Sequence, residues 1–456
     1  MAKKSTAFRV GKVRAYLRGQ AWYLCYHEHG QRRRPRVGPD KQAARQLAAQ
    51  VNAQLQLGAP AALSFEPLTI PELRRRWLEH HEQVLRSSVQ TIHRYRTATE
   101  HLLRFLEARP VRHAAHFHSS HAEEFVRYLR GLRVSPNGHP HTARRPLLDK
   151  GLRYILECCR AVFNYAARRR HLSPYAENPF AALEIERIPI EHARPIALFT
   201  AEQERAFLEA CDDWQFPLFL TLVLTGLRPG ELAHLLLPDD LDLDAGRLRV
   251  RNKPALGWQV KTRNERDIPL VPALVEVLRV SLAGRRAGPV FLRRRWAGRP
   301  LPPLASAGPA ALERELSRRV AVREAEAGAP LGRAERGWLA RRLWQDLGAV
   351  KGDRIRGEFM RLTRGIGLPG CTAPKVLRHL FATALQEGRV DPLIRNELMG
   401  HVAAGQRTAG HGLAMTAVYT HTRPETRRQQ LEAALAPRVA VAVARAWLGR
   451  QAGNAK

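Results

Sequence analysis

The first sixty residues carry polar and apolar side chains in short alternating runs, which is the pattern of half-buried β-strands. The runs lie at 12–17, 22–26 and 32–37. From residue 41 the apolar spacing lengthens to that of a helix, which we expect to begin after Asp40 and to end at Gly58. The pattern predicts a small β3α domain, with three strands and one helix, over residues 1–60.

Residues 68–182 have apolar positions every three to four residues, which is typical of amphipathic helices. Four helices are predicted, one after Thr69, one at about 88–107, one from a capping box at 120–123 and one at about 147–170. Together they predict an all-α bundle whose polar faces are rich in arginine and histidine.

A proline-punctuated linker at 183–198 separates this bundle from a third domain. A capping box at 200–203 opens the third domain, which mixes helical runs with short strands and extends to about residue 436. It contains an insertion at about 303–350, and an Ala- and Arg-rich helical tail follows at 437–456 as a candidate docking segment. The predicted fold class is multidomain and mainly α, with an N-terminal β3α domain, an all-α bundle and a mixed α+β third domain.

Basic residues far outnumber acidic ones, with 75 Lys and Arg against 42 Asp and Glu and a formal net charge of +33. A charge this large favours a polyanionic partner, above all nucleic acid, over mere solubilising surface charge. Only ten of the basic residues are lysines. Because arginine keeps its proton and lysine can release one, a lysine at a special position is informative in this chain.

Four arginines at 32, 33, 34 and 36 lie in the third predicted strand. They suggest a DNA-binding face on the N-terminal sheet. The alternative is an edge strand that charge protects from pairing with other chains.

Five cysteines show no CxxC spacing, which predicts a reducing compartment and no zinc site. No signal peptide is visible after the first residues, and no apolar run reaches the roughly 18 residues of a membrane helix. We therefore expect a cytoplasmic protein, bacterial or phage-derived and associated with the nucleoid, without a membrane partner. Four histidines at 113, 116, 118 and 121 lack a carboxylate or thiolate at ligand spacing, so we expect no metal there.

The first candidate site lies at a helix corner. An apolar helix stops at Gly226, and Pro229 suits the first position of the next helix, so Arg228 caps that helix and Glu231 lies in its first turn. Free N–H groups at the helix start can face an anion together with Arg228. An ordinary corner with a solvent-exposed arginine would show the same pattern.

Further cations follow along the chain. Three runs predict an antiparallel sheet, at 247–251, 258–262 and 266–270. Lys261 lies where the second of these strands enters its turn. Pro374 starts a helix on which Lys375 and Arg378 share one face, and such a like-charged pair repels unless an anion lies over it.

His401 ends a later helix, and Tyr419 ends a short apolar run. A phenol has a pKa of about 10 and is a poor nucleophile alone. Tyr419 therefore needs cations that stabilise developing charge, and without them it would be a packing residue.

The order of these residues resembles the tyrosine recombinases, also called the phage integrase family. The matching stretches are 225–232, 375–383, 398–401 and 418–421. The resemblance covers about 68–435 and implies a helical core-binding domain at 68–182 and a catalytic domain at 198–436. The sheet at 1–60 is similar, more weakly, to the arm-binding domain of some phage-type integrases.

The resemblance implies a role for each matched residue. Tyr419 would attack a DNA phosphodiester, leaving a 3′-phosphotyrosyl link and a free 5′-hydroxyl. Arg228 and Arg378 would clamp the non-bridging oxygens, because bidentate guanidinium–oxyanion bonds are strong. Lys261 would protonate the 5′-oxygen, and Glu231 would support the arginine geometry. The phosphotyrosine keeps the bond energy, so no cofactor, ATP or metal is required.

Two positions depart from the family pattern. Lys375 stands where a histidine is most common, which removes an imidazole that could accept the tyrosine proton and predicts an altered pH dependence. His401 fills the second histidine position, but 18 residues separate it from Tyr419, about twice the usual spacing. His411 is the competing candidate; we prefer His401 because it ends a well-patterned helix.

The resemblance implies a site-specific DNA recombinase that integrates or excises a mobile element, acts on double-stranded DNA as a homotetramer and uses no small-molecule substrate. We expect Tyr419 to act in its own active site. A type IB topoisomerase shares this chemistry, and a DNA-binding protein that has lost catalysis is a second alternative. The separate arm-like domain favours recombination.

Overall fold

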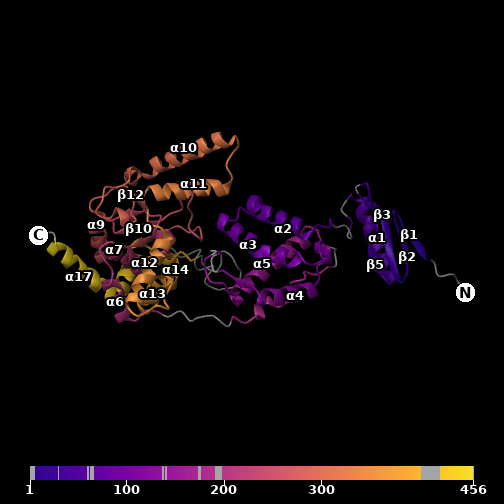
Figure 1. The fold of residues 1–456 in the computed structure, drawn as a ribbon, viewed down its shortest axis with the longest axis horizontal. Helices are drawn as coiled ribbons and strands as arrows, with labels where there is room; N and C mark the ends of the chain where they lie inside the picture. Colours follow the sequence, from indigo (N-terminus) through magenta and orange to yellow (C-terminus); the bar gives the residue numbers. More distant parts are fainter. Residues whose placement is uncertain are drawn as a thin grey trace. The chain divides into compact units, whose positions relative to one another are not determined.

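The computed structural model describes residues 6–28, 30–58, 61, 66–135, 138, 141–172, 176–190, 198–401 and 422–454. The chain divides into two compact units, Met1–Arg194 and Pro195–Lys456 (Figure 1). The protein is multidomain and mainly helical, with a small sheet at its N-terminus.

The N-terminal sheet has five strands where the sequence predicted three. They are β1 (Ala7–Val10), β2 (Val13–Arg18), β3 (Ala21–Glu28), β4 (Gln31–Arg33) and β5 (Arg36–Gly38). Strands β1 to β4 pair in order, and β5 also pairs with β3. The third predicted strand is divided because Pro35 has no N–H to donate to a ladder. The first strand escaped prediction because it is only four residues long.

Helix α1 (Lys41–Gln56) covers one face of this sheet. Asp40 caps it by accepting from the N–H groups of Gln42 and Ala43 at 2.8 and 3.3 Å. The core between helix and sheet is formed by Val13, Ala15, Trp22, Leu24, Tyr26, Ala44, Ala48 and Val51.

The rest of the first unit is a helical bundle. Its main helices are α2 (Ile70–Glu79), which continues as a π-helix at His80–Val84, α3 (Val89–Leu106), α4 (Ser119–Arg130) and α5 (Asp149–Arg168). A two-stranded ribbon of β6 (Arg133–Val134) and β7 (Arg145–Pro146) connects α4 to α5. Short 3-10 turns lie at Ala114–His116 and Ile185–Arg187. Ile185 is fully buried in the bundle core, so this part of the predicted linker belongs to the bundle.

The start of α4 differs from the predicted capping box. The N-cap is His118, two residues before the predicted Ser120, and His121 Nδ1 accepts from the backbone N–H of His118 at 3.1 Å. This contact, and not a glutamate, closes the first turn. Within the described residues no group of His, Cys, Asp and Glu could hold a metal ion.

The second unit is built around α7 (Gln215–Thr225), which is buried along its whole length. Its sequence is apolar on all sides, as expected of a central helix. The helices packed around it include α6 (Ala201–Glu209), α9 (Pro272–Leu282), α13 (Lys375–Glu387) and α17 (Val439–Asn454). Further described helices of this unit include α8 (Pro229–Leu232), α12 (Gly352–Gly365), α14 (Pro392–Met399) and α16 (Pro424–Leu435).

The predicted tail is wrong as a separate segment, because α17 completes the core of this unit. Ala440, Val443 and Ala444 are buried, and the Trp447 ring stacks on Phe216 with centroids 5.1 Å apart. The indole N–H of Trp447 also donates to Asp213 at 3.0 Å.

The sheet of this unit differs from the prediction. It pairs β9 (Leu241–Asp242), β10 (Arg247–Val250) and β11 (Arg266–Pro269) in the order β11-β10-β9. A second small sheet pairs β8 (Leu236–Leu237) with β12 (Gly288–Pro289). The predicted strand at 258–262 is irregular: Trp258 forms only an isolated bridge to Lys253, and Lys261 lies in a turn.

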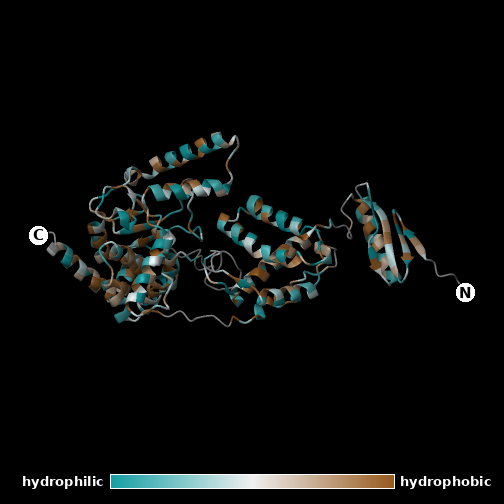
Figure 2. Cartoon of the chain, in the orientation of Figure 1, coloured by the Kyte–Doolittle hydropathy of each residue, from teal (hydrophilic) through white to brown (hydrophobic). Residues whose placement is uncertain are grey.

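The insertion forms a helical hairpin of α10 (Pro309–Ala327) and α11 (Arg333–Asp346), preceded by 3-10 turns at Arg294–Trp296 and Pro303–Ser306. Most residues of the two helices are hydrophilic (Figure 2), although Val322 and Trp338 are exposed. Trp344 anchors it to the 3-10 turn Pro254–Leu256 by donating to the carbonyl of Leu256 at 3.0 Å. No described helix has the length and apolar character needed to cross a membrane.

Candidate active site

The end of α7 begins the site. Gly226 closes the helix in the left-handed region, with φ at +61°, and a Cβ there would lie 2.3 Å from the Phe381 ring. Both constraints call for glycine. The carbonyl of Gly226 accepts a hydrogen bond from Arg378 Nη1 at 2.6 Å, so this turn holds an arginine from α13.

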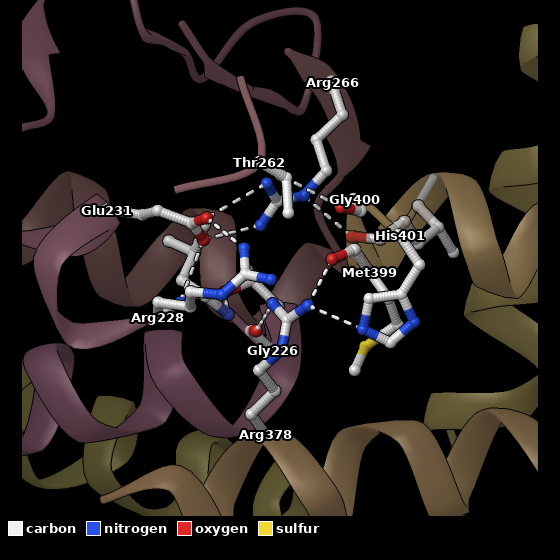
Figure 3. A network of polar contacts seen from close by, with 12 residues as sticks. Gly226, Arg228, Glu231, Thr262, Arg266, Arg378, Met399, Gly400 and His401 are labelled. Atoms are coloured by element: carbon white, nitrogen blue, oxygen red, sulfur yellow. Dashed lines mark hydrogen bonds and ion pairs between the residues drawn. The ribbon is translucent and has the colours of Figure 1, made fainter. Parts of the chain in front are cut away.

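Arg228 follows at the start of α8, as predicted from Pro229. Glu231 accepts two hydrogen bonds from Arg228 (Figure 3). Its Oε2 accepts from the backbone N–H of Arg228 at 2.9 Å, and its Oε1 accepts from Arg228 Nη1 at 2.7 Å. The Arg228 side chain is 24% exposed, whereas that of Glu231 is 3% exposed. The carboxylate of Glu231 is therefore buried behind Arg228, and the Arg228 guanidinium remains accessible from the site.

Arg266, which the sequence reasoning missed, is the second partner of Glu231. Its Nη2 and Nη1 donate to the carboxylate at 2.7 and 3.3 Å, and its Nε donates to the carbonyl of Leu398 at 2.9 Å. The signal was present in the sequence, because alternation along β11 places Arg266 on the same buried face as Ile268. An arginine at a buried strand position requires a partner.

Arg378 lies at the centre of the network (Figure 3). Besides the Gly226 carbonyl, its guanidinium donates to the carbonyl of Met399, and Nη2 lies 3.5 Å from His401 Nε2. Burial lowers the pKa of Arg378 to about 10, helped by the charge of Arg228 and opposed by that of Glu231. It remains charged at neutral pH.

The electrostatics of the site favour an anion. Arg228 and Arg266 both pair with the single carboxylate of Glu231, and Arg378 lies close enough to feel its charge without contacting it. Burial disfavours the charged form of Glu231, but hydrogen bonds from Arg266 and Arg228 outweigh burial and hold its pKa below the ordinary value. Burial, and then the nearby arginines, lower the pKa of His401 and so favour its neutral imidazole. A bound anion would relieve the excess positive charge.

The two candidate lysines are exposed. Lys375 is the first residue of α13, where the helix dipole disfavours a cation unless an anion is present. Lys261 lies in a turn next to Thr262, whose hydroxyl donates to the carbonyl of Gly400 at 3.2 Å. That contact places the Lys261 turn beside the turn that carries His401.

Lys253 lies near the same turn but has a structural role. Its ammonium lies 2.7 Å from Asp240 and over the Trp258 ring, 5.3 Å from its centroid. Asp240 is buried, so this lysine neutralises a buried charge. Lys261 has no such partner among the described residues.

The structure thus brings Arg228, Arg378 and His401 together and places the Lys261 turn at their edge. Lys375 lies one helical turn before Arg378. Tyr419, His411 and the connection at 402–412 lie outside the described residues, so the roles of these two side chains remain predictions. The described chain resumes with α16.

Comparison with known proteins gives a match to the model of the phage integrase family over residues 198–308. The chain is 35% identical over 225 residues to tyrosine recombinase XerC of Rhodospirillum centenum. That match covers 46% of this chain and 47% of the relative, so the chain spans about half the length of this curated protein.

Two solved structures are also similar. The Tn1549 transposon integrase in complex with transposon right-end DNA has a TM-score of 0.49 and 18% identity, over 80% of this chain and 99% of that one. A lambda integrase tetramer bound to a Holliday junction has a TM-score of 0.41 and 16% identity, over 87% and 97% of the two chains.

Proposed function

This chain is a member of the phage integrase family, the tyrosine recombinases, and from that premise we propose that it is a site-specific DNA recombinase acting through a 3′-phosphotyrosyl intermediate. The observation that carries the proposal is the meeting of Arg228, Arg378 and His401 in one network of hydrogen bonds that contains a single carboxylate, that of Glu231. We expect the protein to integrate or excise a mobile element.

Two arginines would hold the reacting phosphate. A guanidinium has five N–H donors. Arg228 uses one on Glu231, and Arg378 uses two on backbone carbonyls, which leaves donors on both for the non-bridging oxygens. Because Glu231, Gly226 and Met399 already fix these side chains, little reorganisation is needed when the phosphate enters.

The remaining groups would move protons. The Tyr419 oxygen would form a bond to phosphorus while the bond from phosphorus to the 5′-oxygen breaks. Lys261 would give a proton to that leaving oxygen, and the neutral imidazole of His401 can accept the phenol proton. Lys375 at the start of α13 would add an ammonium to the anion site.

The first unit offers two surfaces for double-stranded DNA. The sheet face opposite α1 carries a stacked pair, Tyr16 and Tyr23, with ring centroids 5.8 Å apart, and their strand neighbours include Arg14 and Arg36. Arg33 instead lies 3.7 Å from the buried Glu28, so not all four arginines at 32–36 belong to this face.

The second surface is a groove of about 940 Å³ between α3, α5 and the β6–β7 ribbon. Its lining includes His93, Arg94, Arg104, Arg133 and Arg144. Basic and aromatic side chains on these two surfaces suit phosphate and base contacts. We propose residues 1–60 as the arm-like domain, the bundle as the core-binding domain, and a homotetramer on DNA, in the cytoplasm, as the active form.

The test is a covalent trap. Suicide duplexes, nicked beside each candidate cleavage position and built from the sequences that flank the gene, should form a covalent complex with the protein. Tyr419→Phe should form none, and Arg228→Ala should slow trapping by a factor of about 10²–10³, the usual effect of losing one electrostatic stabiliser. Absence of any adduct would leave only a DNA-binding function.

Two further readouts separate the alternatives. Strand exchange between two duplexes supports recombination, whereas relaxation of supercoils without exchange supports a type IB topoisomerase. Mixing Tyr419→Phe with Arg228→Ala protein should not restore cleavage if each tyrosine serves its own site.

A further inference from the structure

A second group of cations surrounds a hollow of about 460 Å³ in the second unit, apart from the candidate active site. Its lining includes Arg293, Arg294 and Arg295 from one segment and Lys351, Arg354 and Glu358 from another. Trp214 also lines it and precedes α7, whereas the catalytic arginines lie beyond the other end of that helix. Eleven helical residues span about 16 Å, so one phosphate cannot occupy both places.

Backbone pairing holds the two basic segments together. Leu292 and Ala349 form an antiparallel bridge, and the N–H of Arg293 donates to the carbonyl of Gly348 at 2.8 Å. The Arg293 Nε also donates to the carbonyl of Ala349 at 3.1 Å. The position of the cations is therefore set by the fold and not by flexible side chains alone.

Four of these cations have no ion-pair partner within the described part of the chain: Arg293, Arg295, Lys351 and Arg354. Arg294 differs, because Asp212 and Glu358 lie 2.6 and 3.5 Å from its guanidinium. Elsewhere in this unit cations are commonly paired, as Arg319 is with Glu315 and Asp346.

The grouping is unfavourable without an anion. The Nη2 of Arg293 is buried and has no hydrogen-bond partner. Burial lowers the pKa of both Arg293 and Lys351, and the neighbouring cations lower it further. Lys351 and Arg354 also lie at the start of α12, whose first N–H groups have no side-chain cap. Unpaired cations and free N–H groups together match a phosphate.

We propose that this basic hollow binds the phosphate backbone of DNA at a position separate from the reacting phosphate. The proposal rests on the proposed function, which makes DNA the polyanion that this chain meets. The planar forks of Arg295 and Arg354 and the N–H groups of α12 would also bind carboxylates, so an acidic protein segment is the alternative that the experiment tests against DNA.

The experiment measures equilibrium binding of the full chain to a 30-base-pair duplex of random sequence over a range of NaCl concentrations. Arg354→Ala should lower the slope of log K against log [NaCl] by about 0.9 and weaken binding about eightfold at 0.1 M salt, because one phosphate contact is lost. Lys351→Ala with Arg354→Ala should lower the slope by about 1.8.

Arg364→Ala is the matched control, since Arg364 is an exposed arginine on the same helix and does not line the hollow. All the replaced side chains are exposed, and circular dichroism checks that the variants fold. Equal slopes for the wild-type and double-variant proteins, or an equal loss for Arg364→Ala and Arg354→Ala, would overturn the proposal. The proposal would also be overturned if the double variant lost binding to poly-glutamate but kept its binding to DNA.

The binding assay does not depend on covalent chemistry. Tyr419→Phe protein should show the same slope as the wild type. Failure of the covalent trap with a normal salt effect would therefore reject the recombinase function and leave the phosphate site standing.

Discussion

Replacing Glu231 with glutamine removes one charge and leaves the shape of the side chain almost unchanged. The carboxylate is buried between two arginines and accepts four hydrogen bonds from them, at 2.7 to 3.3 Å. In the variant, one oxygen becomes an NH₂ group that faces guanidinium donors. Arg266, only 7% exposed, then keeps its charge without a carboxylate to neutralise it.

The expected loss of unfolding free energy is about 3–5 kcal/mol, the usual result when one partner of a buried ion pair is removed. That is a large share of the roughly 5–15 kcal/mol that stabilises a typical domain. The effect should depend on pH. Because the pKa of Glu231 is lowered on folding, its contribution is fully present above 4.5 and is lost as pH falls below 4.5 through the folded pKa. The difference between wild type and variant should therefore shrink in acid.

Urea unfolding at pH 7 and pH 4, with hydrogen exchange read by mass spectrometry on peptides from α7 and α13, measures this loss in the second unit. Glu276→Gln is the control, because Glu276 forms an exposed pair with Arg279 at 2.8 Å and should contribute at most about 1 kcal/mol. A loss below about 1 kcal/mol for Glu231→Gln, or one equal to the control, would refute the view that this carboxylate holds the arginines.

Two other predictions concern the same site. Gly226→Ala should destabilise the unit by about 1–3 kcal/mol in urea unfolding, because alanine is strained at positive φ and its Cβ would meet Phe381, whereas Gly230→Ala, with open space around it, should not. In the free protein His401 should titrate below 6.5 by NMR, and Arg378→Ala should raise its pKa by removing the nearest positive charge. An unchanged His401 titration in Arg378→Ala would show that the charge of Arg378 does not contribute to that pKa.

Local sequence features predicted the elements that carry the site. Gly226 marked the end of α7, because glycine is common just after the last helical residue. Pro229 marked the start of α8, because proline is favoured at the first position of a helix. The i, i+3 spacing of Lys375 and Arg378 identified one helix. It did not show that Arg378 is buried while Lys375 is exposed, since that difference depends on what α13 packs against.

Strands were less predictable than helices. The run at 258–262 alternates like a strand, yet the pairing partner of β10 is β11, and Trp258 and His234 stack at 4.9 Å instead. Alternation reports which side chains are buried and does not report which backbone groups pair. The composition of α17 suggested a tail. In the structure its small residues and Trp447 pack against α6, α7 and α9, and composition does not report such packing partners.

The contacts that support the site could not be predicted from local sequence patterns, because they join distant parts of the chain. Arg266 and Leu398 are 132 residues apart, and Gly226 and Arg378 are 152 apart. The residues proposed to touch the phosphate were recognisable because chemistry restricts them to few types. The groups that hold them include backbone carbonyls, which any residue supplies, so the sequence contains no mark of them. Gly400 has both kinds of constraint: its φ of +61° is a local requirement for glycine, whereas the 2.8 Å that would separate a Cβ from Arg266 Nη1 depends on a side chain far away in the sequence.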